Sequence, residues 1–206
     1  MVEYTLWGNT VNLNLSRDTF PTDDEIKSMD ENGLTSQHGF FESNRGGHKL
    51  HYRKCMPPNG VTPKGMCVFE HGIQGHGGMS VVENGERYKY ALLPKLLTDA
   101  GYILYILDMY GHGFSEGERF YIPESDWTLN RDDLDSFAVF ASHQEGAEQL
   151  PLFLMGESYG ACLVLHVARQ WMDSPEESPS NYKGICISAP GKLKQVRLKV
   201  FLKQSS

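Results

Sequence analysis

From residue 66 onward, short apolar runs alternate with longer segments whose apolar residues recur at helical spacing. The continuous apolar runs are typical of strands buried on both faces of a parallel sheet. They cover residues 66–69, 102–107, 152–155 and 184–188. The segments with helical periodicity cover residues 88–97, 129–141 and 161–172. This alternation predicts an α/β fold with a mostly parallel sheet.

The sheet is expected to open with an antiparallel hairpin. Residues 40–43 lead into a turn at 44–47 that contains two glycines, and residues 48–53 return with alternating side chains. Ahead of this hairpin, Thr22 and Glu25 form a capping-box pattern and Gly33 is a stop signal, which predicts one short helix. We therefore divide the chain into three parts. These are an extension (1–36), a partial domain of this fold (37–190) and a basic tail (191–206).

Composition narrows the class of protein. A net charge of -7 argues against nucleic acid as a partner. The N-terminus has no cationic segment followed by an apolar one, and no run reaches the length of a membrane span. Three of the four cysteines lie in apolar runs, as expected of buried free thiols. These features favour a cytoplasmic protein.

The strongest chemical motif is Gly156-Glu157-Ser158-Tyr159-Gly160, between a predicted strand and a predicted helix. In that position a Gly-x-Ser-x-Gly string describes a nucleophile elbow, a tight turn that presents a serine hydroxyl above the sheet. Gly156 and Gly160 leave room for the turn, and the following helix N-terminus favours developing negative charge. The alternative is a glycine-rich connection with an incidental serine.

A second motif, residues 70–78, follows the strand at 66–69 and contains His71, Gly72 and His76. The loop after that strand supplies an oxyanion-hole N–H in folds with a nucleophile elbow. The alternative is a metal loop in which His71 and His76 are ligands, but no third ligand has suitable spacing. We expect neither a metal nor a cofactor.

A third motif, residues 108–117, follows the strand at 102–107 and contains Gly111, His112 and Gly113. Such a glycine-rich loop is usually structural. His112 is a tempting catalytic base, but the base of this fold comes last in chain order. We therefore interpret His112 as a residue that shapes the loop.

Taken in order, these motifs resemble the monoacylglycerol lipase and lysophospholipase group, also called serine aminopeptidase S33-like. The resemblance covers about residues 37–190. It implies an α/β-hydrolase fold, Ser158 as nucleophile, and the backbone N–H groups of Ile73 and Tyr159 as oxyanion donors. It also implies an acyl-ester lipid substrate, such as a monoacylglycerol or a lysophospholipid. Tyr159 replaces the methionine usual after the nucleophile, which predicts a reshaped acyl pocket.

The rest of a catalytic triad is missing from the expected places. The triad of this fold runs Ser, then Asp or Glu, then His. Acidic residues after Ser158 occur only between 173 and 177, before the last predicted strand. The one histidine after Ser158 is His166, two turns along the helix. We expect the chain to lack the triad acid and histidine and to stop after about the sixth strand.

The tail differs in charge from the preceding domain. Residues 191–203 contain five basic residues and no acidic one, so an amphipathic tail could touch a membrane surface, although a misread or truncated gene end explains it more simply. Two hypotheses remain. The first is a serine ester hydrolase, and the second is an inactive truncated isoform or pseudoenzyme that binds lipid or protein. A peptidase is least supported, because nothing forms a pocket for a peptide amino terminus.

Overall fold

The structure is a computed structural model that describes residues 2–6, 9–13, 35–44, 46–73, 75–77, 92–118, 122 and 127–190. Three sequence predictions lie outside these residues. They are the helix between Thr22 and Gly33, residues 88–91 of the helix expected at 88–97, and the basic tail 191–206.

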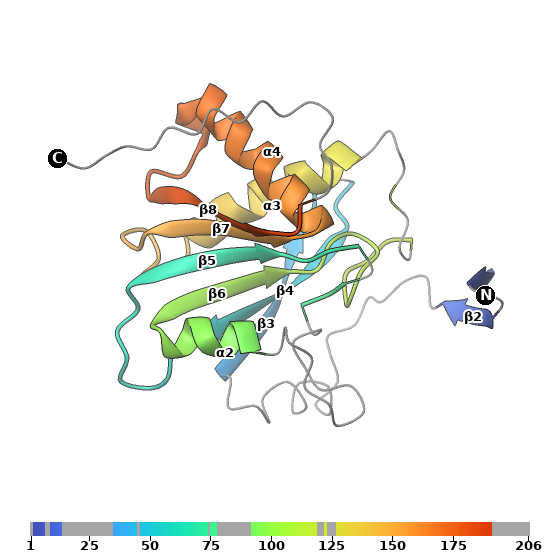
Figure 1. The fold of residues 1–206 in the computed structure, drawn as a ribbon, viewed down its shortest axis with the longest axis horizontal. Coiled ribbons are helices and arrows are strands. Elements are labelled where there is room, and N and C mark those ends of the chain that lie inside the picture. The colour runs from blue at the N-terminus through green and yellow to red at the C-terminus, as the bar shows by residue number, and fades with distance from the viewer. Residues whose placement is uncertain are drawn as a thin grey trace.

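The main sheet has six strands in the order β3-β4-β6-β5-β7-β8 (Figure 1). Their bounds are β3 Thr35–Glu42, β4 Lys49–Met56, β5 Gly65–Glu70, β6 Tyr102–Leu107, β7 Leu152–Glu157 and β8 Tyr182–Ser188. Strands β3, β4 and β6 are paired antiparallel, whereas the pairs made by β5 with β6 and β7, and by β7 with β8, are parallel. This confirms the predicted α/β class, the opening hairpin and the mostly parallel sheet.

Helices cover both faces of the sheet (Figure 1). Helices α3 (Trp127–Ser142) and α4 (Tyr159–Asp173) pack on one face, and α2 (Leu92–Asp99) packs on the other. A 3-10 turn, η2 (Pro175–Glu177), follows α4. The helices predicted at 129–141 and 161–172 are confirmed, each extending by one or two residues at its ends. The described part of the helix expected at 88–97 begins at Leu92.

The two faces of β5 show how the strand pattern builds two cores. Met66 and Val68 belong to the large apolar cluster beneath α3 and α4, with Phe137 of α3 fully buried in it. Cys67 and Phe69 point to the opposite face, where a smaller cluster packs against α2. Successive strand residues point to opposite faces, so a strand that is apolar at every position needs helices on both sides.

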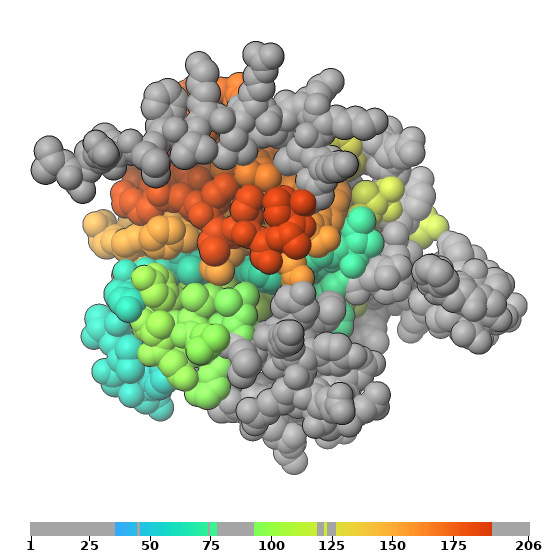
Figure 2. Space-filling view, in the orientation of Figure 1, coloured from blue at the N-terminus to red at the C-terminus, as the bar shows by residue number. Residues whose placement is uncertain are grey.

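Some features differ from the sequence predictions. Strands β1 (Val2–Leu6) and β2 (Asn9–Leu13) form an antiparallel hairpin that was not predicted, although apolar residues alternate in both. All four cysteines are free, but Cys186 is exposed, so the prediction of a buried thiol is wrong there. It lies on β8, whose side chains are at most half-buried and which is visible on the surface in Figure 2. No helix among the described residues is long and apolar enough to cross a membrane.

Candidate active site

Ser158 lies on a strained turn between β7 and α4. Its φ of 52° and ψ of -116° place it in a region that residues other than glycine rarely adopt. The flanking glycines are required by close approach. A Cβ on Gly156 would lie 2.7 Å from the backbone of Gly160, and a Cβ on Gly160 would clash with the carbonyl oxygens of Glu70 and His71. The sequence therefore folds here into the geometry of a nucleophile elbow.

Tyr159 is the first residue of α4, so its N–H is one of the four at the helix N-terminus without an intrahelical acceptor. This N–H group belongs to the residue that directly follows the exposed Ser158 in the sequence. The Tyr159 ring instead packs against the large apolar cluster, and its hydroxyl accepts a hydrogen bond from Asn130 Nδ2 at 3.2 Å. The predicted effect of this side chain on an acyl pocket is therefore not seen, because Tyr159 does not line the cavity beside Ser158.

The loop after β5 reaches the nucleophile. A Cβ on Gly72 would lie 3.2 Å from Ser158 Cβ and 3.7 Å from its Oγ. The Gly75 N–H donates to the Gly72 carbonyl oxygen at 3.0 Å, which closes a tight turn around Ile73. The Ile73 side chain is 54% exposed. The structure thus brings Gly72 against Ser158, and Ile73 lines the same cavity as Ser158.

His71 is held as a neutral imidazole. Its Nδ1 lies 2.7 Å from the Gly72 carbonyl oxygen, and its Nε2 accepts a hydrogen bond from the Met109 N–H at 3.1 Å. Burial lowers the pKa of His71 to about 4, although nearby Asp108 opposes the shift. Because both ring nitrogens are used, His71 has no nitrogen left for a metal. Among the described residues, no group of three His, Cys, Asp or Glu side chains could hold a metal ion.

The loop after β6 lies against the loop after β5. His112 is fully buried, its Nδ1 lies 2.9 Å from the Tyr110 carbonyl oxygen, and its ring centroid is 5.3 Å from that of His71. Gly111 and Gly113 have positive φ angles of 71° and 49°, which glycine adopts without strain. These contacts favour the interpretation of His112 as a loop-shaping residue.

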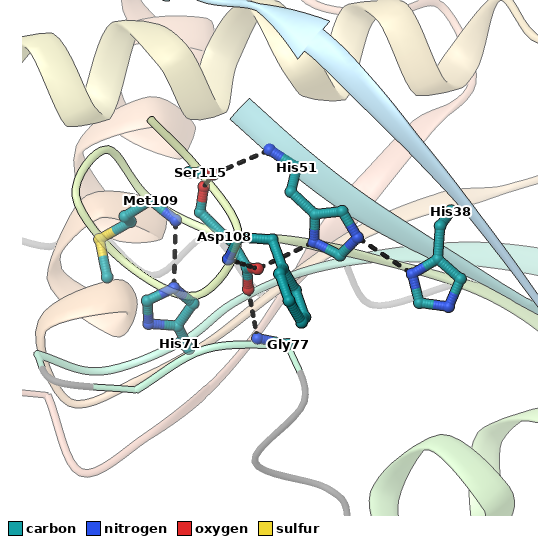
Figure 3. Close-up of polar contacts among 8 residues, drawn as sticks. His38, His51, His71, Gly77, Asp108, Met109 and Ser115 are labelled. Carbon is teal, nitrogen blue, oxygen red and sulfur yellow. Dashed lines mark hydrogen bonds and ion pairs between the residues drawn. The ribbon is translucent and has the colours of Figure 1, made fainter. Parts of the chain in front are cut away.

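Asp108, at the start of this loop, makes hydrogen bonds to three other residues that the sequence did not predict (Figure 3). It is 1% exposed, and it accepts hydrogen bonds from the N–H groups of Gly77 and Phe114 and faces His51 Nδ1 at 2.9 Å. Burial alone would raise the pKa of Asp108, but the hydrogen bond and charge of His51 hold it well below its ordinary value. Neither His51 nor Asp108 was assigned a role from the sequence, although a histidine within a strand of alternating side chains was a usable signal.

A cavity of about 250 Å³ opens beside Ser158 on the face covered by α2. The apolar side chains that line it come from β5, the loop that follows β5, β6 and α2. They are Phe69, Ile73, Leu93, Pro94, Leu104 and Ile106. Four polar side chains also line the cavity, and they are His71, His76, Glu157 and Ser158. An apolar cavity with a few convergent polar groups is the usual form of a small-molecule site.

Within the described part of the chain, no histidine hydrogen-bonds the Ser158 hydroxyl. The His166 ring packs against Trp127 at a tilt of 49°, with ring centroids 4.5 Å apart, and burial lowers the pKa of His166. His166 lies within α4, eight residues after Ser158, which corresponds to a rise of about 12 Å along the helix axis. Among the described residues, the strained turn at Ser158 and the loop after β5 thus lie together, and no histidine side chain is hydrogen-bonded to the serine.

Comparison with known proteins gives a consistent family. The profile of the serine aminopeptidase S33 family (Hydrolase_4) matches residues 61–204. Human monoglyceride lipase is 28% identical over 129 residues, which cover 63% of this chain and 36% of that protein. Caffeoylshikimate esterase of Arabidopsis thaliana is 25% identical over 174 residues, covering 84% of this chain and 45% of that protein. The chain thus spans less than half the length of these relatives.

Solved structures support the fold. A soluble variant of monoglyceride lipase from Saccharomyces cerevisiae, in complex with a substrate analogue, matches with a TM-score of 0.58 and 21% identity. The match covers 76% of this chain and 44% of the yeast chain. Est1E from Butyrivibrio proteoclasticus, solved with ferulic acid, matches with a TM-score of 0.53 and 22% identity, covering 66% of this chain and 48% of Est1E.

Proposed function

Because this chain belongs to the serine aminopeptidase S33 family and has an α/β-hydrolase fold of the monoglyceride lipase type, we propose that it provides the nucleophile-bearing part of a serine hydrolase that cleaves acyl esters. The single observation that carries the proposal is the strained turn at Ser158, with Gly72 packed directly against it. Strain at one exposed serine is typical of a functional site.

The proposed reaction begins when Ser158 Oγ attacks the acyl carbonyl carbon. The hydroxyl proton passes to a general base, and the carbonyl oxygen becomes an oxyanion that accepts hydrogen bonds from the N–H groups of Ile73 and Tyr159. The C–O bond to the alcohol then breaks, and the alcohol leaves with a proton. Water hydrolyses the acyl-enzyme and releases a carboxylic acid.

The base and its orienting acid are the missing parts. No histidine is hydrogen-bonded to Ser158 in the described residues, so we propose that the triad acid and histidine are not supplied by this stretch of chain. A serine hydroxyl without a base is a weak nucleophile, and triad members act as a unit. The isolated chain should therefore turn over esters only at the residual rate that an oxyanion hole gives, about a thousandfold over water.

The substrate class follows from the cavity and from the relatives. The cavity beside Ser158 is lined by apolar side chains of β5, the loop after it, β6 and α2, and this favours an apolar acyl group. Two of the matched proteins are named monoglyceride lipase, and a third is named an esterase. We propose an acyl-ester lipid, such as a monoacylglycerol or a lysophospholipid, as the substrate.

The test is ester hydrolysis by the protein produced from its own gene in its source cells. Cells expressing Ser158→Ala are compared with wild type and with Ser180→Ala, a control at an exposed turn serine. We expect hydrolysis of monoacylglycerol and p-nitrophenyl esters to be lost in Ser158→Ala and kept in Ser180→Ala. Equal turnover in wild type and Ser158→Ala would overturn the proposal.

A second candidate function is favoured by the absence of a base near Ser158 in the described residues. In this alternative the protein is an inactive truncated isoform or pseudoenzyme that binds lipid or protein. It predicts that the natural protein has a mass near 23.2 kDa and no Ser158-dependent turnover. Ser158-dependent hydrolysis by a folded chain of that mass would exclude it.

A further inference from the structure

The loops after β5 and β6 are joined by a buried hydrogen-bond cluster that begins on β4. We call His51, His71, Gly77, Asp108 and Ser115 the polar cluster (Figure 3). None of its side chains is more than 3% exposed. It lies at the carboxyl ends of β5 and β6, and its members His71 and Gly77 belong to the loop that packs against Ser158.

His51 and Asp108 are bonded to each other through both side chains and backbones. His51 Nδ1 lies 2.9 Å from Asp108 Oδ2, and the Asp108 N–H donates to the His51 carbonyl oxygen at 2.8 Å. Ser115 adds two bonds, because its Oγ accepts from the His51 N–H at 2.8 Å and donates to the Asp108 carbonyl oxygen at 2.5 Å. The Asp108 carboxylate is therefore fixed in one orientation.

The fixed carboxylate holds the far end of the oxyanion loop. Asp108 Oδ1 accepts a hydrogen bond from the Gly77 N–H at 2.5 Å. A Cβ on Gly77 would lie 3.2 Å from that oxygen, so the backbone approaches closely. The near end of the loop is held by His71, through Met109 and Gly72. The turn around Ile73 lies between these two anchors.

We propose that His51 is a positioning residue for the oxyanion loop. It orients the Asp108 carboxylate, the carboxylate holds the Gly77 N–H, and the loop thereby keeps the Ile73 N–H beside Ser158. Its effect on the reactivity of Ser158 rests on the proposed function, whereas its effect on the loop does not. Displacing an oxyanion donor by about 1 Å can cost about 100-fold in rate.

The test uses two substitutions of equal shape. His51→Asn keeps an N–H donor near the Nδ1 position. His51→Leu introduces a side chain with the same shape as asparagine but without a donor. Amide hydrogen exchange is measured on the purified chain for residues 70–77, with residues 152–157 of β7 as an internal reference. We expect exchange of the Gly77 amide to rise about tenfold or more in His51→Leu and to stay near wild type in His51→Asn, because only a hydrogen-bonded amide is protected.

A second readout concerns Ser158 itself. A fluorophosphonate ester forms a P–O bond to the serine oxygen with loss of fluoride and the hydroxyl proton. On protein captured from its source cells, we expect the labelling rate of Ser158 to fall about 10- to 100-fold in His51→Leu and to recover in His51→Asn. Wild-type protein that is not labelled at Ser158 would contradict the proposed function, while the exchange measurement still decides the inference.

A control covers the case in which His51→Leu does not fold. His38→Leu removes the hydrogen bond between His38 Nδ1 and His51 Nε2, 3.0 Å apart, and leaves the contact with Asp108 in place. We expect a smaller rise in Gly77 exchange in that variant. Unchanged exchange at Gly77 in the folded variants, or equal exchange in His51→Leu and His51→Asn, would overturn the inference.

Discussion

The apolar cluster beneath α3 and α4 and the polar cluster behind Ser158 are both buried, yet they are built on different rules. In the first, Phe137 is surrounded by the rings of Phe41, Tyr52 and Phe140 at centroid distances of 5.4–5.9 Å. In the second, His51 and Asp108 are joined by directional hydrogen bonds, 2.9 Å long between their side chains and 2.8 Å long between their backbones. Contacts in the apolar cluster add up without regard to direction, whereas each polar group in the second cluster depends on particular partners in a particular geometry.

The difference indicates that the stability of the sheet and the geometry of the loop beside Ser158 depend on different kinds of interaction. Apolar burial is non-directional, so the cluster under α3 and α4 stabilises the sheet without fixing any one atom. Buried hydrogen bonds add little net free energy but are costly to leave unmade. Under the role proposed for His51, the polar cluster fixes the loop beside Ser158 rather than adding net stability. Three predictions test this comparison.

The largest expected effect is in the apolar cluster. Phe137→Ala removes a ring that is fully buried, so the free energy of unfolding should fall by about 3–5 kcal/mol. Urea denaturation measures this, with Phe140→Ala at a half-buried position of the same helix as the control. A loss below about 1 kcal/mol would show that the cluster does not carry the stability of the domain.

The next effect is a pH dependence in the polar cluster. Burial lowers the pKa of His71 from 6.5 to about 4, so between these values the unfolded chain binds more protons than the folded one. Stability is therefore lost as the pH falls from 6.5 to 4, by about 3 kcal/mol. Denaturation of wild type and His71→Asn across this range isolates the effect. Equal slopes for the two proteins would contradict it.

The smallest expected effect is a gain in the free energy of unfolding rather than a loss. Glu70 is fully buried, and its carboxyl oxygens have no hydrogen-bond partner among the described residues. Burial, with the charges of Asp108 and Asp133, raises the pKa of Glu70 well above its ordinary value. Glu70→Met removes this unpartnered acid, so at pH 7 the free energy of unfolding should rise by about 1–3 kcal/mol.

The pH dependence of that gain is a further check. A raised pKa in the folded state means that wild-type stability is lost as the pH rises through it. The gain in Glu70→Met should therefore grow with pH and shrink toward pH 4.5. A variant that is less stable than wild type at pH 7, with a control Glu177→Met unchanged, would show that Glu70 contributes to stability.

The two clusters also differ in how far the sequence predicts them. The strand at 102–107 was predicted with the bounds that β6 has, because continuous apolar runs report burial locally. The turn at Ser158 was also predicted, because the five residues of its motif are consecutive in the sequence. The polar cluster was not predicted, because His51 and Asp108 are 57 residues apart and only strand order brings them together. Ile73 and Tyr159 remain predictions as oxyanion donors.

The central claim is that Ser158 is the nucleophile, and its most direct test is covalent. Protein captured from its source cells is treated with a fluorophosphonate ester, and the modified peptide is identified by mass spectrometry. We predict one adduct, on Ser158 in the peptide that joins β7 to α4. An adduct on another residue, or none on folded wild-type protein, would contradict the account.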